Sequence, residues 1–280
     1  MELITIETVR KILKPRQKNA YKNNFGNVLI IAGSEGMMGA AVLAAKACLK
    51  SGVGLLTVHV PNKYYLLFPS VLPEAMYNLD TSSNFITDQL KDNKYNAIGM
   101  GPGIGMNINT CEAIKYFLEN KSKPTVIDAD ALNIISTNEH LKILLKGTLL
   151  TPHVGECKRL VGIWHDDDEK NQKILDFVKK YECVLMLKGM NSTIYSPKGN
   201  IYLNTTGNPG MAKAGSGDAL TGILTALIGQ GYSLEESAIA GVFIHGLAGD
   251  FAVENNSNYS MLASDLINYL PIAFKDVLGE

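Results

Sequence analysis

The chain has 280 residues, of which 46% are hydrophobic, and a formal net charge of −1 at pH 7. This length and composition allow a large α/β core, and the near-neutral charge gives no broad electrostatic surface for nucleic acid. No uninterrupted apolar run approaches the roughly 18 residues that cross a bilayer, and the first residues lack the pattern of a signal peptide. The four cysteines form no CxxC motif. We therefore expect reduced thiols in a cytoplasmic enzyme, with no nucleic acid or membrane partner.

The first 25 residues differ from the rest because they are rich in cations. No acid follows Glu7 in this segment, which contains Arg10, Lys11, Lys14, Arg16, Lys18 and Lys22. We interpret it as a solvated arm or a short amphipathic helix. A dinucleotide phosphate or a neighbouring subunit is the alternative partner for these cations.

Short apolar runs separated by helical segments predict a mainly parallel, buried sheet. The expected strands are 27–32, 55–60, 74–79, 96–101, 124–130, 147–151 and 183–187. Two further segments, 193–196 and 200–204, flank a PKG turn and predict an antiparallel hairpin. Helices are expected in an Ala-rich stretch ending at Ser51 and Gly52, and at 233–252 and 263–278. No linker or repeat divides the chain, so we expect residues 1–280 to form one domain.

Two glycine loops follow predicted strands. The first, GSEGMMGA at 33–40, is neither GxGxxG nor a Walker A motif, which argues against a Rossmann dinucleotide domain and a P-loop enzyme. A ligand could approach the backbone at Gly39, Ala40 and Ala41, and tight helix–sheet packing explains the small residues equally well. The second loop, GPGIG at 101–105, lies where α/β proteins bind ligands, so we favour a ligand role for it.

Polar residues follow three of the later strands. Asp128 and Asp130, on one face of a continuing strand, suit a cation or a hydroxyl group, with capping and core contacts as the equal alternative. Thr151 and Pro152 predict an N-cap and first helical residue, which puts His153 in the first turn. There it contacts either a ligand or the helix start. Lys188 lies at a strand end beside a glycine turn, a position that suits a phosphate.

Two other patterns are not metal sites. His153 and Glu156 lie three residues apart on a helix, but no second His or Cys pair completes a transition-metal site. The four acids of 166–169 do not alternate as calcium ligands do, and a helix start with favourable charges explains them. We therefore assign no metal ligands.

The stretch GNPGMAKAGSGDALTG at 207–222 is the centre of the interpretation. An apolar stripe predicts that a buried helix follows it, with Gly215, Ser216, Gly217 and Asp218 at or just before the first turn. Backbone N–H groups there lack helical partners, and the helix dipole favours an anion. The pattern favours a phosphate site with a carboxylate base, Asp218, over an Asp218 that only caps the helix.

Together these motifs resemble the ADP/ATP-dependent NAD(P)H-hydrate dehydratases, a family of the ribokinase-like superfamily. The matching stretches occur in order over about residues 27–250: GSEGMMGAAVLAAKACLKSGVGLLTV, GMGPGIG, VIDADALN, LLTPHVGE, LMLKGMNSTI, GNPGMAKAGSGDALTGILTALIGQG and FIHGLAGD. The resemblance implies a three-layer ribokinase-like fold with a mainly parallel sheet between helices. It also implies a homotetramer.

The resemblance implies repair of hydrated NADH and NADPH. A nucleotide phosphorylates the hydroxyl of the hydrate, and loss of phosphate restores the double bond. Asp218 would be the catalytic base. The adenine nucleotide would be held by Lys188, Gly189, Met190, Asn191, Ser192 and Gly217, beside the anion site of Gly215 and Ser216. The hydrate would contact Gly39, Ala40, Ala41, Gly103, Gly105, His153 and Asp218. Mg2+ is expected with the phosphates.

Several functional points depend on details of the sequence. Residues 1–26 are too short for the epimerase domain that some relatives carry, and the stand-alone bacterial members that the chain resembles favour ADP over ATP. One rival function is a small-molecule kinase of the same superfamily, similar to hydroxyethylthiazole kinase, which would release a stable phosphorylated product. Another is a regulatory nucleotide-binding protein, although such a protein has little need for an acid at Asp218.

Overall fold

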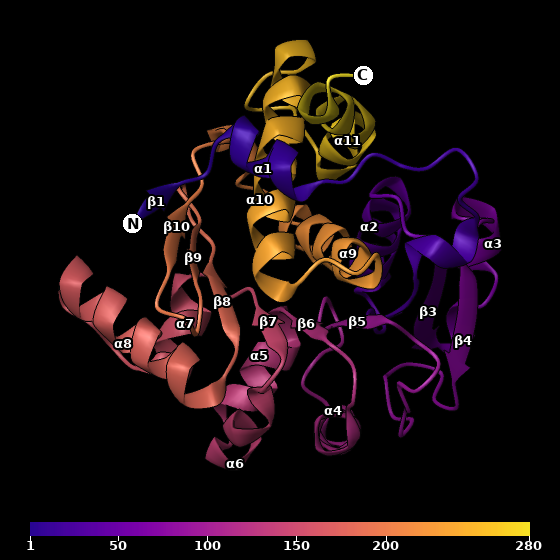
Figure 1. Cartoon of the computed structure of the whole chain (residues 1–280). Coiled ribbons are helices and arrows are strands. Elements are labelled where there is room, and N and C mark those ends of the chain that lie inside the picture. Colours follow the sequence, from indigo (N-terminus) through magenta and orange to yellow (C-terminus); the bar gives the residue numbers. More distant parts are fainter.

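The computed structural model describes residues 1–280 and contains one ten-stranded sheet (Figure 1). The strand order is β1-β10-β9-β8-β7-β6-β5-β2-β3-β4, and only β9 runs against its neighbours. The strands are β1 (Glu2–Leu3), β2 (Asn27–Ile31), β3 (Leu55–Pro61), β4 (Met76–Asp80), β5 (Ala97–Met100), β6 (Thr125–Ile127), β7 (Thr148–Leu150), β8 (Val184–Leu187), β9 (Thr193–Tyr195) and β10 (Ile201–Leu203).

Helices cover both faces of the sheet, so the predicted α/β sandwich with a late antiparallel hairpin is confirmed. The helices are α1 (Ile6–Ile12), α2 (Met38–Lys50), α3 (Leu67–Val71), α4 (Ile108–Asn120), α5 (Ala129–Ser136), α6 (Glu139–Lys142), α7 (Val154–Val161), α8 (Asp167–Tyr181), α9 (Ser216–Gly229), α10 (Leu234–Asn255) and α11 (Ala263–Leu278). Four short 3-10 helices lie at Lys22–Phe25, Asn62–Tyr64, Ile143–Leu145 and Pro209–Met211.

The sheet has a hydrophobic core on each face. The larger core joins the sheet to α1, α2, α3, α9, α10 and α11, and the smaller one joins it to α4 to α8. Both faces of the central strands are therefore buried, which explains why the sequences of these strands are continuous apolar runs. The free cysteines contribute to this packing: Cys48, Cys157 and Cys183 are fully buried, and burial raises the pKa of each thiol.

The register of the sheet brings the carboxyl ends of its parallel strands to one edge. Ile31 pairs with Met100, Met100 with Ile127, and Ile127 with Leu150. β8 continues this arrangement because Leu150 pairs with Leu185. The residues that follow these strands therefore emerge side by side, although they are far apart in sequence. This edge is where ligands bind in open α/β sheets.

The helix α9 lies in the middle of one layer, with every residue from Ala219 to Gly229 buried. Gly222 allows the close approach of α2, since a Cβ there would lie 2.0 Å from the Ala44 carbonyl oxygen. The absence of a side chain at Gly222 therefore lets this helix pack closely against α2. Burial of the helix body fixes the position of its first turn.

The longest helix, α10, is long and apolar enough to cross a membrane by length and composition alone, although acidic residues interrupt its apolar run. Within the fold, 72% of its most apolar window is buried. It begins with a capping box in which Ser233 and Glu236 satisfy each other's backbone N–H groups. We interpret α10 as a core helix.

The basic N-terminal segment packs on the rest of the chain. The predicted short helix is α1, whose Val9 is fully buried. Arg10 donates to the carbonyl oxygens of Asp276 and Val277 in the last turn of α11. Arg16 donates to Gly52 and lies 3.7 Å above the ring centre of Phe25. These cations bind helix ends and an aromatic ring within the chain, so the arm is not simply solvated.

Candidate active site

The first turn of α9 presents free backbone N–H groups at the carboxyl edge of the sheet. Gly215 is the N-cap residue, and its left-handed backbone (φ 95°) favours glycine. Ser216, Gly217 and Asp218 form the first turn, as the sequence predicted. A Cβ on Gly217 would lie 3.3 Å from the Lys188 ammonium nitrogen, so this glycine keeps a small space open beside a cation. The arrangement fits an anion.

Asp218 has the electrostatics of a base that works near neutral pH. Burial, together with the charges of Asp128 and Asp130, raises the pKa of its carboxyl group to about 6, and the charge of Lys188 partly opposes this shift. No hydrogen bond contributes to the shift, so the carboxylate is not engaged in capping its own helix. A carboxylate without partners beside an anion site can accept a proton from a bound hydroxyl group.

Asp128 binds both Lys188 and α9. Its Oδ1 accepts from the Lys188 ammonium group at 2.6 Å, and its Oδ2 accepts from the Thr221 hydroxyl at 2.9 Å. The Asp128 side chain is 2% exposed and that of Lys188 is 21% exposed. The ion pair therefore lies within the wall of the site, against the first turn of the buried helix.

The predicted placement of Asp128 and Asp130 on one strand face is wrong. The strand β6 ends at Ile127, and Asp128 is the residue before α5. Between the two acids, Ala129 adopts a left-handed backbone (φ 49°), which is uncommon for alanine. The bend directs the two side chains to different partners, because Asp130 accepts from the backbone N–H of Gly105 at 2.9 Å. Core polar contacts and loop support are thus their observed interactions.

The loops predicted to contact the hydrate lie next to each other. A Cβ on Gly103 would lie 3.1 Å from the Ala40 Cβ, and the Ser34 hydroxyl donates to the Gly103 carbonyl oxygen at 2.8 Å. Gly39 lies in the first turn of α2 with open space above it, whereas Ala41 is fully buried. Gly39 and Ala40 thus line the accessible side of this turn, and Ala41 packs behind it.

His153, and not Thr151, is the N-cap residue of α7. The Nδ1 atom of His153 accepts from the Gly155 N–H at 2.9 Å, and the Glu156 carboxylate accepts from the His153 N–H at 2.8 Å. The chain stays extended up to His153 because it pairs with Lys188, whose N–H donates to the Pro152 carbonyl oxygen at 2.8 Å. The observed role of His153 is a helix-start contact, and its side chain remains 56% exposed at the sheet edge.

The residues after β8 form an open loop beside Lys188. Gly189, Met190 and Asn191 are exposed, and Met190 is 90% exposed. The Ser192 hydroxyl donates to the Gly189 carbonyl oxygen at 3.4 Å, which closes the loop before β9 begins. This loop leaves polar and apolar groups free on the Lys188 side of the site.

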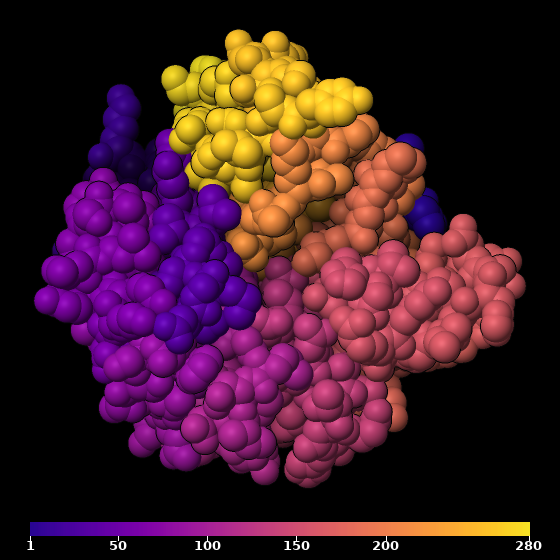
Figure 2. Space-filling view, turned by 180° about the vertical axis from the view of Figure 1, so that it is seen from behind, coloured from indigo at the N-terminus to yellow at the C-terminus, as the bar shows by residue number.

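Contacts between neighbours join the predicted site segments into one site. Lys188 links Asp128 and Gly217 on one side, and Asp130 links to Gly105 on the other. Figure 2 shows a hollow in the middle of one face, where the violet, pink and orange parts of the chain meet.

Two supporting residues were not identified from the sequence. His245 on α10 contacts the carbonyl oxygen of Ser216 through Nε2 at 3.0 Å, and burial lowers the pKa of its imidazole to about 4. Asp250, also on α10, accepts from the Gly207 N–H and from the Asn208 amide, each at 2.9 Å. Both lie in the FIHGLAGD stretch, which could have indicated that α10 supports the glycine loop.

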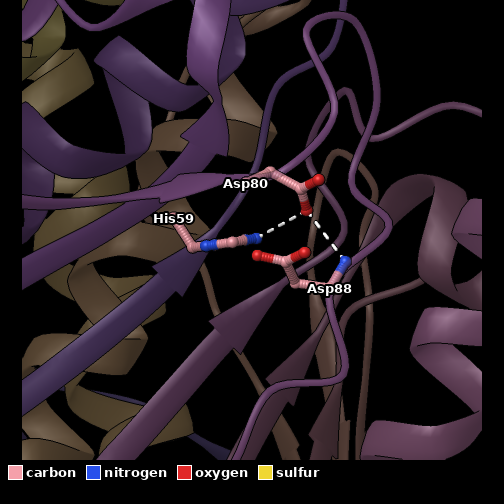
Figure 3. Close-up of side chains that lie close together, drawn as sticks. All are labelled: His59, Asp80 and Asp88. Carbon is pink, nitrogen blue, oxygen red and sulfur yellow. Dashed lines mark hydrogen bonds and ion pairs between the residues drawn. The ribbon is translucent and has the colours of Figure 1, made fainter.

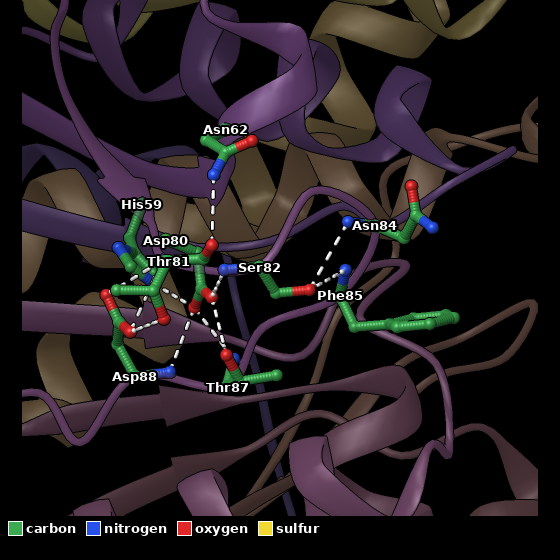
Figure 4. Close-up of polar contacts among 9 residues, drawn as sticks. All are labelled: His59, Asn62, Asp80, Thr81, Ser82, Asn84, Phe85, Thr87 and Asp88. Atoms are coloured by element: carbon green, nitrogen blue, oxygen red, sulfur yellow. Dashed lines mark hydrogen bonds and ion pairs between the residues drawn. The ribbon is translucent and has the colours of Figure 1, made fainter.

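A second cluster, made by His59, Asp80 and Asp88, has the composition of a metal site (Figure 3). Its carboxylate oxygens, however, already accept hydrogen bonds from the protein. Asp80 accepts from His59 Nε2 at 2.9 Å, and also from the backbone N–H groups of Ser82, Thr87 and Asp88. Asp88 accepts from the Thr81 N–H and hydroxyl (Figure 4). A cation bound here would face the hydrogens of these N–H and O–H groups, which repel positive charge. We therefore interpret the cluster as a support for the 80–88 loop.

Comparison with known proteins identifies the family. A family model described as NAD(P)H-hydrate dehydratase matches residues 28–272. The chain belongs to this family. The ADP-dependent (S)-NAD(P)H-hydrate dehydratase of Bacillus subtilis is 32% identical over 97% of each chain. The chain also matches bifunctional NAD(P)H-hydrate repair enzymes at 32–36% identity, and it spans about half of their length.

Solved structures of similar proteins agree with this membership and with the ribokinase-like fold. A ribokinase-like superfamily protein from Enterococcus faecalis has a TM-score of 0.88 at 25% identity and covers 100% of this chain and 97% of its own. The ADP/ATP-dependent NAD(P)H-hydrate dehydratase of Bacillus subtilis, co-crystallised with ATP and Mg2+, has a TM-score of 0.80 at 28% identity. That alignment covers 99% of this chain and 98% of the dehydratase.

Proposed function

We propose that the protein is an ADP-dependent (S)-NAD(P)H-hydrate dehydratase that restores NADH and NADPH from their hydrates. The observation that carries this proposal is the partner-free carboxylate of Asp218, whose pKa is raised to about 6 by burial in the first turn of α9. A relative named for this activity is 32% identical over nearly the whole chain. A kinase-like site with a base beside an anion site suits the phosphoryl-transfer half of such a reaction.

The proposed chemistry has two balanced steps. Asp218 takes the proton of the hydrate hydroxyl while that oxygen attacks the terminal phosphoryl group of ADP, and AMP leaves. The carbon–oxygen bond of the resulting phosphate ester then breaks, a proton leaves the neighbouring ring carbon, and the ring double bond re-forms as inorganic phosphate departs. The first-turn N–H groups of α9 would stabilise charge on the transferring group.

The proposed contacts fall into two groups. We place the nucleotide against Lys188, the 189–192 loop and the Gly215–Gly217 turn, because Lys188 lies beside Gly217 and the loop follows Lys188 directly. We place the hydrate against the Gly39–Ala41 turn, Gly103, Gly105 and His153, with Asp218 between the two groups.

Mg2+ fits a site of this charge. Asp130 already uses one oxygen for the Gly105 N–H, so phosphate oxygens and water would supply most of the metal's ligands. We assign no protein ligand. When bound, Mg2+ neutralises charge on the transferring phosphoryl group.

One assay tests the function. Purified protein is incubated with NADH hydrate, Mg2+ and either ADP or ATP, while the return of NADH absorbance and the release of phosphate are followed. The proposal expects both signals in equal amounts, with ADP the better donor. A stable phosphorylated product without phosphate release would instead indicate a small-molecule kinase similar to hydroxyethylthiazole kinase. Absence of any turnover would leave a nucleotide-binding protein without chemistry.

We also propose that residues 1–280 act as a single cytoplasmic domain that assembles as a homotetramer. Two exposed apolar side chains of the edge strand β4, Met76 and Tyr77, support association. Light scattering during size-exclusion chromatography measures the mass in solution. A mass of one chain would overturn the tetramer.

A further inference from the structure

Lys188, Asp128 and Asp218 form a row of charges beside the first turn of α9. The Lys188 ammonium nitrogen lies 2.6 Å from Asp128 Oδ1. Thr221, whose hydroxyl donates to the other Asp128 oxygen at 2.9 Å, lies three residues after Asp218. Residues three apart share one face of a helix, so Asp128 lies on the face of α9 that carries Asp218.

Local structure does not account for the position of Asp128. The residue precedes α5, yet its side chain caps no backbone N–H group of that helix. The left-handed backbone of Ala129, which holds it in place, is a strained conformation for alanine. Both carboxylate oxygens point instead to Lys188 and Thr221, towards the site. A carboxylate held against strain to pair with a site cation indicates a functional constraint.

Arrival of a nucleotide would change this pairing. A phosphate group at the N-terminus of α9 competes with Asp128 for the Lys188 ammonium group. If Lys188 moves towards the phosphate, Asp218 loses a neighbouring positive charge and remains beside the uncompensated Asp128 carboxylate. The phosphate adds more negative charge. All three changes favour the protonated form of Asp218, and therefore raise its affinity for a proton.

We propose that Asp128 is a positioning residue that holds Lys188 in the empty site and yields it to the nucleotide phosphate, so that nucleotide binding makes Asp218 a stronger base. This inference rests on the proposed function, in which Asp218 is that base. The base then reaches full strength only when the phosphoryl donor is present.

The other charged groups around Asp218 stay the same during this exchange. Asp130 on α5 keeps its bond to Gly105. His245 on α10 is neutral above about pH 5, because burial lowers its pKa to about 4. Asp250 on α10 is bound to Gly207 and Asn208, and His153 lies beside Lys188 at the sheet edge. Asp218, with a pKa raised to about 6 by burial and by Asp128, is the buried group of this set that titrates near pH 6.

The test measures ADP binding by calorimetry from pH 5 to 8, without hydrate. Relative to Asp218→Asn, which shares the ionisation of the ADP phosphate, the wild-type affinity should fall as pH rises through the titration of Asp218, since ADP favours the protonated form. In Asp128→Asn the unpaired Lys188 should bind ADP up to about tenfold more tightly, and the midpoint of the fall should move down by up to about one pH unit. Asp218→Asn should remove the fall. Unchanged or weaker binding by Asp128→Asn, with an unmoved midpoint, would overturn the proposal.

Two further variants keep the test decisive. Asp92→Asn removes another buried carboxylate, which accepts from the Ser122 and Lys123 N–H groups outside the site, and should leave the ADP profile unchanged. Lys188→Met leaves Asp128 charged, and should weaken ADP binding and move the midpoint to higher pH. Lys188→Met carries the test if Asp128→Asn does not fold. A pH midpoint in Lys188→Met that is unchanged or lower than in the wild type would overturn the proposal. Failure to turn over hydrate despite this ADP profile would overturn only the proposed function.

Discussion

The imidazole Nε2 of the buried His245 lies 3.0 Å from the carbonyl oxygen of Ser216, the first residue of α9. A neutral imidazole donates its N–H to that oxygen, and burial keeps it neutral by lowering its pKa to about 4. The contact ties the first turn of α9 to the neighbouring core helix α10.

The burial of His245 predicts a loss of stability in mild acid. The folded pKa lies below the ordinary value of 6.5, so the stabilisation is present above pH 6.5 and is lost as pH falls from 6.5 towards 4. Converted at about 1.4 kcal/mol per pH unit, the loss is at most about 3 kcal/mol. His245→Gln keeps a donor but cannot titrate. In urea unfolding at pH 7 and pH 5, the wild type should therefore lose more stability than this variant, and equal losses would contradict the assignment.

Asp218→Asn should abolish turnover while the fold and nucleotide binding persist. Loss of a general base costs about 10²–10⁴-fold in rate. The variant should also be more stable than the wild type at pH 8. The folded pKa of Asp218 is raised to about 6, so the wild type loses stability as pH rises from about 4 through 6. The gain should be on the order of 1–3 kcal/mol at pH 8 and vanish near pH 4. Turnover within a few-fold of the wild type would refute the base.

Two substitutions of His153 separate its two possible roles, the helix-start contact and a contact with the hydrate. His153→Asn keeps a side-chain acceptor for the first turn of α7, whereas His153→Ala removes it and should cost about 1 kcal/mol of stability. If His153 also contacts the hydrate, both variants should raise KM for the hydrate more than Kd for ADP. If His153 has only a structural role, His153→Asn should have the KM of the wild type for the hydrate. Thermal melts of both variants measure the structural contribution.

Gly217 and Gly222 lie on the same helix and should respond differently to alanine. A Cβ at Gly217 meets the Lys188 ammonium group at 3.3 Å, so Gly217→Ala should weaken ADP binding with little change in Tm. A Cβ at Gly222 would lie 2.0 Å from the Ala44 carbonyl oxygen, so Gly222→Ala should separate α9 from α2 and lower Tm markedly. ADP calorimetry and thermal melts on both variants measure the two effects. The reverse result would contradict the placement of the anion site.

ADP with Mg2+ should stabilise the folded protein. A ligand at about 100 times its dissociation constant adds roughly 2.7 kcal/mol. Thermal melts with millimolar ADP, ATP or AMP measure the effect, and Lys188→Met is the matched control because it removes the site cation. A melting temperature that is unchanged by all three nucleotides would contradict the nucleotide site.

The sheet was predictable because its strands are short apolar runs, and the first turn of α9 because glycines precede an apolar stripe. The errors arose where tertiary contacts override local preference. Thr151–Pro152 has the pattern of a helix start, but pairing with Lys188 keeps the chain extended to His153. Alanine rarely adopts a left-handed backbone, so nothing at Ala129 indicated the bend that separates Asp128 from Asp130. The contacts of Asp80 come from β3 and from a loop without regular secondary structure, which periodicity does not pair.

The position of α9 has a consequence for the order in which the chain can fold during synthesis. Strands β2 to β8 and the helices of the smaller core are complete by residue 187, but the larger core needs α9, α10 and α11, which end at residue 278. Until those helices leave the ribosome, one apolar face of the nascent sheet is covered only by α1, α2 and α3. Chains that stop before residue 216 should therefore be bound by chaperones or aggregate.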